Sequence, residues 1–139
     1  MADPFDLQRF VDAQAPVYDA VRRELKAGRK QSHWMWFIFP QIAGLGQSPM
    51  SIRFAIASLN EAKAYLAHPV LGLRLRECAR LTLDVEGGSA RDIFGPIDEM
   101  KFRSSMTLFA HAAPDEELFQ RCIDKYFVGC PDPATTARL

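Results

Sequence analysis

Ser32-His33-Trp34-Met35-Trp36-Phe37-Ile38-Phe39-Pro40-Gln41 is the stretch around which we expect the chain to fold. It holds both tryptophans of the protein and, from Met35 to Phe39, an unbroken row of large apolar side chains. Neither a helix nor a strand can turn such a row to one side, so the run belongs inside a core that covers it from several directions. The sequence therefore predicts that residues 35–39 lie at the centre of the molecule.

Polar residues stand at both ends of this run. His33 precedes it, Gln41 follows it, and a loop containing Gly44 and Gly46 comes next. Buried histidine and glutamine side chains need hydrogen-bond partners. Apolar walls with a few polar groups are typical of small-ligand pockets, but ordinary cores also contain them. The pattern alone leaves both interpretations open.

The length and the charge of the chain limit the class of protein. A chain of 139 residues is typical of one domain, so we expect a single domain over residues 1–139 that needs no metal or disulfide to form its core. Its 17 basic and 17 acidic side chains cancel, which disfavours extended nucleic acid and anionic membranes as partners. No apolar run approaches the length of about 18 residues that a membrane-spanning helix requires.

The cysteines indicate the compartment. Cys78, Cys122 and Cys130 form no Cys-x-x-Cys pair and are odd in number, which favours reduced thiols and disfavours a structural zinc site. The first residues, Met1-Ala2-Asp3-Pro4, lack the basic-then-apolar pattern of a secretion signal. We expect a soluble cytoplasmic protein and predict no metal and no cofactor, while the oligomeric state stays open.

Apolar residues recur at helical spacing through most of the chain, and no segment alternates apolar and polar residues as a strand does. Capping residues, prolines and glycines mark the helix ends. The sequence predicts a compact all-α bundle of about seven to eight short helices, over residues 4–14, 16–28, 49–54, 58–68, 69–85, 89–94, 97–112 and 114–128. Residues 131–139 are expected to form either one more turn or a loose tail.

The predicted helix 97–112 carries polar residues where a core face is expected. At about 100° per residue, Glu99, Arg103 and Thr107 fall on the side that we interpret as facing water. The opposite side contains Ile97, Phe102, Met106, Leu108 and Phe109 together with Asp98, Lys101 and Ser105, and Ser104 lies at its edge. Buried charges must be paired or used. Asp98 and Lys101 therefore form either a structural ion pair or the polar floor of a pocket.

Two other features each have a structural and a functional interpretation. The loop from Gly44 to Ser48 leads into a helix that Pro49 begins, so it is either a tight connection, which we favour, or a set of backbone N–H groups for an anion. The basic cluster Lys26, Arg29 and Lys30 at a helix end is most simply solvated, with anion binding as the alternative.

Six motifs stand out along the chain: Arg9-Phe10-Val11-x-Ala13-Gln14, residues 32–41, Gly44-Leu45-Gly46-x-Ser48, Tyr65-Leu66-x-His68-Pro69-Val70-Leu71-Gly72, Ile93-Phe94-Gly95, and Asp98-x-x-Lys101-x-x-Ser104-Ser105-Met106-Thr107-Leu108-Phe109. With these motifs, nearly the whole sequence resembles a bacterial family known as domain of unknown function 1810, some of whose members carry the label calpastatin. The resemblance implies a compact α-helical fold and no established activity. The apolar content and the lack of repeats do not fit a disordered, repetitive inhibitor.

A weaker resemblance concerns chemistry. Ile93-Phe94-Gly95 followed by Asp98, Lys101 and a helix containing Met106 is similar in outline to the end of the NADAR family, helical proteins linked to hydrolysis of N-glycosidic and ADP-ribose-type bonds. The glycine-rich loop that those proteins carry after Trp-Gly is missing here. We therefore transfer no NADAR catalytic role to any residue.

The first function hypothesis is a small-molecule site for a nucleotide-like or ADP-ribosyl ligand, with hydrolysis as one version. Asp98 would act as general base, Lys101 would neutralise developing charge, and His33 is an equal acid or base candidate. The ligand-binding candidates, which would stack a ring or hold polar and phosphate groups, are Trp34, Trp36, Gln41, Gly44, Gly46, Ser48, Ser104 and Ser105.

Two further hypotheses remain. In one, the protein is a non-catalytic binding module for a protein partner, which docks in the same pocket or on an exposed helix face. In the other, His33, Asp98 and Lys101 only form a buried network in a protein that acts through its surface. No nucleophile-elbow motif accompanies the serine, histidine and aspartate residues, so the sequence shows no nucleophile triad.

Overall fold

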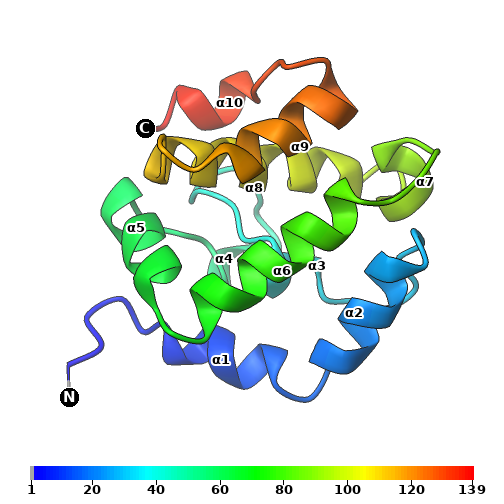
Figure 1. Cartoon of the computed structure of the whole chain (residues 1–139). Coiled ribbons are helices and arrows are strands. Elements are labelled where there is room, and N and C mark those ends of the chain that lie inside the picture. Colours follow the sequence, from blue (N-terminus) through cyan, green and yellow to red (C-terminus); the bar gives the residue numbers. More distant parts are fainter. Residues whose placement is uncertain (1) are drawn as a thin grey trace.

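The computed structural model describes residues 2–139, which form ten helices and no strand (Figure 1). The helices are α1 (Gln8–Gln14), α2 (Tyr18–Lys26), α3 (Met35–Ile38), α4 (Pro49–Arg53), α5 (Leu59–Ala67), α6 (Leu71–Leu83), α7 (Ala90–Phe94), α8 (Asp98–Ala112), α9 (Glu117–Phe127) and α10 (Pro133–Thr136). The all-α prediction is confirmed. The number exceeds the predicted seven to eight because α3 and α10, each a single turn, are additional.

Helix α8 is the centre of the upper half of the molecule in Figure 1. It packs against α5, α7, α9 and α10, while α6 crosses the molecule and contacts α2, α5 and α9. Helices α1 and α2 lie at the opposite end from α10 (Figure 1). Within residues 2–139, no helix combines the length and the apolar character needed to cross a bilayer.

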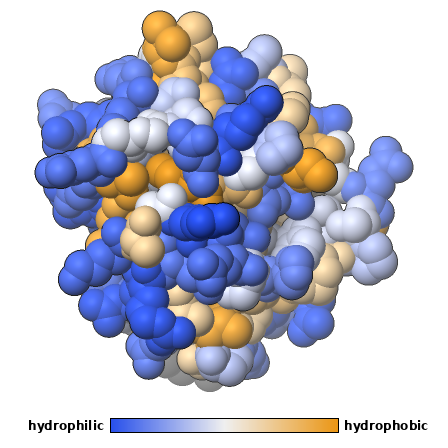
Figure 2. All heavy atoms as spheres, turned by 90° about the vertical axis from the view of Figure 1, so that its right-hand side faces the viewer, coloured by the Kyte–Doolittle hydropathy of each residue, from blue (hydrophilic) through white to orange (hydrophobic). Residues whose placement is uncertain are grey.

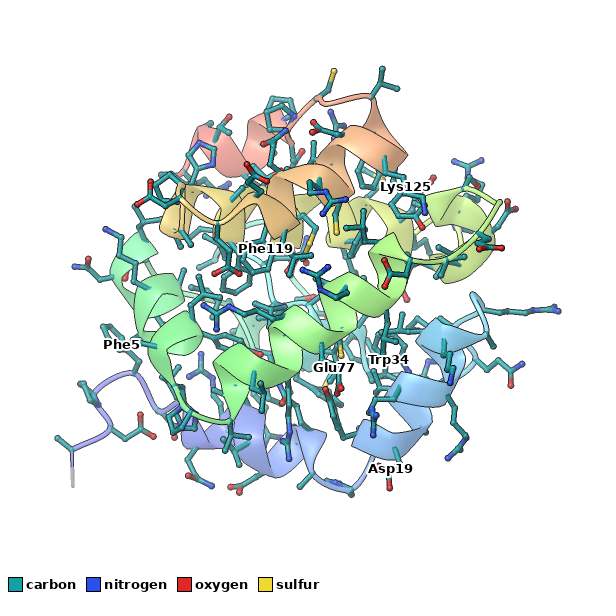
Figure 3. The ribbon with its side chains drawn as sticks, in the orientation of Figure 1. Phe5, Asp19, Trp34, Glu77, Phe119 and Lys125 are labelled. Atoms are coloured by element: carbon teal, nitrogen blue, oxygen red, sulfur yellow. The ribbon has the colours of Figure 1, made fainter. Side chains whose placement is uncertain are left out.

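The aromatic run lies in the core, as predicted. Trp34, Met35, Ile38 and Phe39 are almost completely buried, and α3 takes up only the middle of the run. Phe39 contacts Phe102 of α8 with ring centroids 5.0 Å apart. Trp34 lies inside the molecule in Figure 3, where its label stands between the ribbons of α2 and α6. Ring contacts of this kind add to the free energy gained by burying the aromatic surface.

Three helix starts follow the predicted capping residues, whereas α2, α6 and α9 begin two or three residues after the predicted positions. Ser48 caps α4, Ser58 caps α5, and Ser89 forms a capping box with Asp92 at the start of α7. The predicted start of the first helix at Pro4 is wrong. Asp3 accepts hydrogen bonds from the backbone N–H groups of Leu7 and Gln8, so its carboxylate caps a helix that begins at Gln8, four residues after Pro4.

The predicted water face of α8 is also wrong. Thr107 is fully buried, and its hydroxyl accepts a hydrogen bond from Asp132 N at 2.9 Å. Arg103 donates to the carbonyl oxygens of Cys130 and Pro131. The segment that leads into α10 therefore covers this face. Ile97, which we placed on the buried face, is 71% exposed. Helical periodicity could not reveal this, because the covering segment lies far along the chain.

Candidate functional site

A cavity of about 300 Å³ lies where the start of α8 meets the loop after α3 and the segment of α10. Three stretches that are distant in sequence contribute to it. Its lining residues are Gln41, Leu45, Gly46, Ile97, Met100, Lys101, Arg103, Ser104, Asp132 and Ala134. This volume is at the lower end of the range for small-ligand pockets.

Helix α8 supplies one wall through a single stripe of residues. Met100 and Lys101 lie four and three positions before Ser104 and so line the same side of the helix, which Ile97 extends beyond the helix start. Ile97 and Met100 are 71% and 69% exposed, so both present apolar surface at this wall. Lys101 brings an ammonium group to the same wall, and its side chain is 21% exposed. The wall thus combines apolar surface with two positive charges, that of Lys101 and that of Arg103, whose guanidinium donates hydrogen bonds to the Cys130 and Pro131 carbonyl oxygens.

The loop after α3 supplies a second wall. Its course is fixed by two backbone hydrogen bonds of 2.8 Å, from Ile56 N to the Gln41 oxygen and from Ala43 N to the Ile56 oxygen. A Cβ on Gly46 would lie 2.6 Å from the Ser51 side chain, so a larger residue would push the loop off α4. These constraints hold Gln41 and Gly46 at the cavity.

The C-terminal segment supplies the third wall, and Asp132 anchors it. The Asp132 carboxylate accepts hydrogen bonds from Ser104 Oγ at 2.8 Å and from Thr135 Oγ1 at 2.6 Å. Because Ser104 belongs to α8 and Thr135 to α10, one carboxylate joins the two helices. Asp132 is a site residue that the sequence did not predict, because nothing near it in the chain indicates a partner on α8.

A charged cluster, formed by Lys30, Asp98 and Lys101, adjoins the cavity through Lys101. Lys30 Nζ lies 2.9 Å from Asp98 Oδ2, and Lys101 Nζ lies 3.6 Å from Asp98 Oδ1. Each ammonium also lies over an indole ring, Lys30 5.2 Å from the centroid of Trp34 and Lys101 5.1 Å from that of Trp36. Two positive groups share one carboxylate, so the cluster has a net charge of +1.

The interpretation of Lys30 as part of a solvated helix end is wrong. Its side chain is only 9% exposed and points to Asp98. Its neighbours Lys26 and Arg29 are exposed, as predicted. No local signal separates the three residues, because the partner that draws Lys30 inward begins a helix late in the chain.

Glu24 holds the chain that leads into the aromatic run. Its carboxylate accepts hydrogen bonds from Gln31 N, Ser32 N, Ser32 Oγ and the indole Nε1 of Trp34, the last at 3.1 Å. Burial raises the pKa of Glu24, but the hydrogen bonds outweigh burial and lower the pKa from 4.5 to about 2. Trp34 is thereby fixed in the core by its polar atom as well as by its ring.

Four of the predicted site residues line the cavity together: Gln41, Gly46, Lys101 and Ser104. Asp98 and Trp36 lie outside the lining and contact Lys101. Trp34 has no exposed surface, so its ring is not accessible to a ligand in this structure.

The remaining predicted site residues lie elsewhere. His33 is exposed at the surface, and Ser48 caps α4. Gly44 packs against the Arg138 side chain, which occupies the space a Cβ would need. Ser105 is fully buried, and among the described residues its hydroxyl is the one buried side-chain polar atom without a hydrogen-bond partner. None of these four residues lines the cavity.

A larger groove of about 890 Å³ runs between α6 and the start of α9. Its charged residues are Arg76, Glu77, Arg80, Asp84, Asp115, Glu116, Glu117 and Arg121. Arg76 pairs with Glu116 at 2.9 Å, and Glu77 pairs with Arg22 at 3.2 Å. Solvent-exposed ion pairs of this kind are ordinary protein surface, so we place the candidate site in the smaller cavity.

The buried thiols are not suited to nucleophilic chemistry. Burial raises the pKa of Cys78 and of Cys122 to about 12, which keeps both protonated near neutral pH. Among residues 2–139, no three His, Cys, Asp or Glu side chains are grouped so that they could hold a metal ion. The chemistry available at the site is therefore that of Lys101, Arg103, Gln41 and the hydroxyl and carboxylate groups around them.

Known proteins that are similar to this chain identify its family. A family model described as a protein of unknown function, DUF1810, matches residues 4–139. The chain belongs to the DUF1810 family. The chain is also similar to a solved structure, the conserved hypothetical protein Rv1873 from Mycobacterium tuberculosis, with 55% identity and a TM-score of 0.97. That match covers 99% of this chain and 98% of the other. No curated protein matches the chain.

Proposed function

We propose that this DUF1810 protein binds a small ligand that joins an anionic group to a flat or apolar body, as a nucleotide does. The observation that carries the proposal is the position of Lys101, whose ammonium lines a cavity with two exposed apolar side chains, Ile97 and Met100. Exposed apolar surface beside a few polar groups is typical of ligand sites.

The lining suggests how such a ligand would sit. Ile97, Met100 and Leu45 offer apolar contact to a ring or chain, and Lys101 offers a charge-assisted hydrogen bond to an anion. The Gln41 side-chain amide can both donate and accept a hydrogen bond. An adenine or ribose with a single phosphate fits a cavity of about 300 Å³ better than a dinucleotide such as NAD does.

The geometry supports binding more than hydrolysis. A general base needs an oxygen free to take a proton from water. Both oxygens of Asp98 face an ammonium group, of Lys30 and of Lys101, and Asp98 is not part of the cavity lining. His33, the other candidate acid or base, is exposed and outside the lining. We therefore propose a ligand-binding role without assigning a catalytic residue.

A protein partner is the second candidate function, and the same exposed side chains favour it. Ile97 and Met100 would anchor such a partner through apolar contact. On the face that Figure 2 shows, however, apolar patches are separated by hydrophilic side chains, and no broad apolar surface is continuous. The cavity beside Ile97 and Met100 measures about 300 Å³, the size of a small-ligand pocket, which makes a small ligand the better-supported choice. The free cysteines support the predicted cytoplasmic location.

A thermal-shift and calorimetry panel tests the proposal with AMP, adenosine, ribose 5-phosphate, ADP-ribose, NAD and inorganic phosphate. A ligand at 100 times its Kd should add about 2.7 kcal/mol of stability. Lys101→Met should abolish the shift, whereas Lys63→Met, an exposed lysine on α5, should leave it unchanged. The proposal is wrong if no compound shifts the wild-type protein or if Lys101→Met responds as the wild type does.

A further inference from the structure

The two ion pairs in the charged cluster beside the cavity differ in distance. Lys30 and Asp98 are in direct contact at 2.9 Å, whereas Lys101 stands at 3.6 Å from the other Asp98 oxygen. The Lys30 side chain is 9% exposed, that of Asp98 is 18% exposed and that of Lys101 is 21% exposed. Lys101 is thus the least buried and most loosely held member, and it is the member that lines the cavity.

We infer that Asp98 is an internal counter-ion of Lys101, and that the phosphate group of a phosphate monoester replaces Asp98 as the partner of Lys101. The inference rests on the proposed function and names its ligand class. Asp98 and Lys101 lie one turn apart on α8, so Lys101 can change partners by side-chain rotation while the helix stays in place. A dianionic phosphate attracts an ammonium group more strongly than a carboxylate that another lysine already shares.

Lys30 is a positioning residue in this scheme, since it touches Asp98 and not the cavity. Its ammonium neutralises part of the Asp98 charge and so weakens the hold of Asp98 on Lys101. Without Lys30, Asp98 would pair with Lys101 alone and would compete fully with the ligand. Asp98 and Lys30 therefore have opposite effects on anion affinity, although they form one ion pair.

The indole ring of Trp36 offers a direct signal of the exchange. Lys101 Nζ lies 5.1 Å from the centroid of this half-buried ring, and rotation toward the cavity would change that contact. The protein has two tryptophans, and the other, Trp34, is fully buried with its Nε1 bonded to Glu24. A fluorescence change on binding should therefore come from Trp36 and should be absent in Trp36→Phe.

The test is calorimetric titration of AMP, adenosine and inorganic phosphate into wild-type protein, Asp98→Asn and Lys30→Gln, with tryptophan fluorescence in parallel. Asp98→Asn should bind AMP about two- to fivefold more tightly, the effect expected of a partly exposed ion pair, and Lys30→Gln should bind it more weakly by a similar factor. Affinity for adenosine, which has no phosphate, should not change in either variant. Inorganic phosphate distinguishes recognition of the phosphate alone from recognition of the whole nucleotide.

The outcomes separate this inference from the proposed function. If wild-type protein binds none of the probes, both the proposed function and the inference are wrong. If wild-type protein binds AMP but Asp98→Asn binds it equally well or more weakly, the inference alone is wrong. Weaker binding would favour Asp98 as part of the polar floor of the pocket, one of the two interpretations that the sequence left open. If Asp98→Asn fails to fold, Lys30→Gln decides, because the inference requires weaker AMP binding with unchanged adenosine binding.

Discussion

Lys30, which follows α2, forms an ion pair with Asp98, the first residue of α8, with 2.9 Å between Nζ and Oδ2. The pair joins two segments that are distant in sequence. Lys30 lies over the Trp34 ring of the aromatic run, and Asp98 contacts Lys101, which lines the cavity. Both side chains are mostly buried, so water cannot replace either partner fully.

Lys30→Met should therefore lower the free energy of unfolding by about 1–2 kcal/mol, because Asp98 keeps only the more distant Lys101 as a counter-ion. Urea denaturation monitored by circular dichroism measures the change. Lys26→Met changes an exposed residue at the end of α2 and should stay within about 0.5 kcal/mol of wild type. Equal effects of the two substitutions would contradict a structural role for the pair.

Gly72 is needed where α6 begins beside α5. A Cβ at this position would lie 2.1 Å from the backbone oxygen of Leu66, and a backbone atom cannot rotate away. Gly72→Ala should cost about 1–3 kcal/mol through overpacking, although alanine favours helices more than glycine does. Leu73→Ala, one residue along and 70% exposed, is the control and should change the denaturation midpoint little. A Gly72→Ala variant as stable as wild type would exclude this close approach.

Glu24 should make stability depend on pH in the acid range. Its folded-state pKa is about 2 against an ordinary 4.5, so the folded state favours the charged carboxylate. The contribution is complete above pH 4.5 and is lost as pH falls toward 2. Glu24→Gln should be less stable than wild type at pH 7, and the difference should shrink between pH 4.5 and 2. Urea denaturation at several pH values measures it, with exposed Glu86→Gln as control. A difference independent of pH would indicate a purely steric effect.

The features that the sequence revealed are local ones. The caps at Ser48, Ser58 and Ser89 depend on residues within three positions, and the burial of the aromatic run follows from its own composition. Helix α3 could not be predicted because a continuous apolar run has no helical period.

The site was only partly predictable, because its walls meet through tertiary contacts. Gln41, Gly46, Lys101 and Ser104 could be selected since polar or flexible residues stood out against apolar surroundings. Lys30 and Asp132 could not be selected, because their partners Asp98 and Ser104 lie far away in sequence. Trp34 was selected for its aromatic ring, but a single sequence does not show which of two nearby tryptophans is fully buried.

Val128 has a left-handed backbone with φ of 55°, and its side chain is 90% exposed. A β-branched residue is rare in this conformation, and the cost is about 1–2 kcal/mol. Val128→Asn should therefore raise the free energy of unfolding by about 1 kcal/mol, since asparagine tolerates this backbone better. Val128→Ala removes the exposed methyl groups but keeps the Cβ, so it should gain less. Chemical denaturation of both variants decides; an equal gain would trace the effect to exposed apolar surface instead.

Asp132 should control both the order of the C-terminal segment and the shape of the cavity. Asp132→Ala removes the shared acceptor of Ser104 Oγ and Thr135 Oγ1, at an expected cost of about 1–2 kcal/mol. Hydrogen exchange should rise in residues 130–139 while α8 stays protected, and AMP affinity should fall because one cavity wall loosens. Thr136→Ala, in the same helix, loses only a bond to the nearby Pro133 oxygen and should leave both measurements unchanged. If exchange rises but AMP still binds as in wild type, the segment is not a wall of the ligand site.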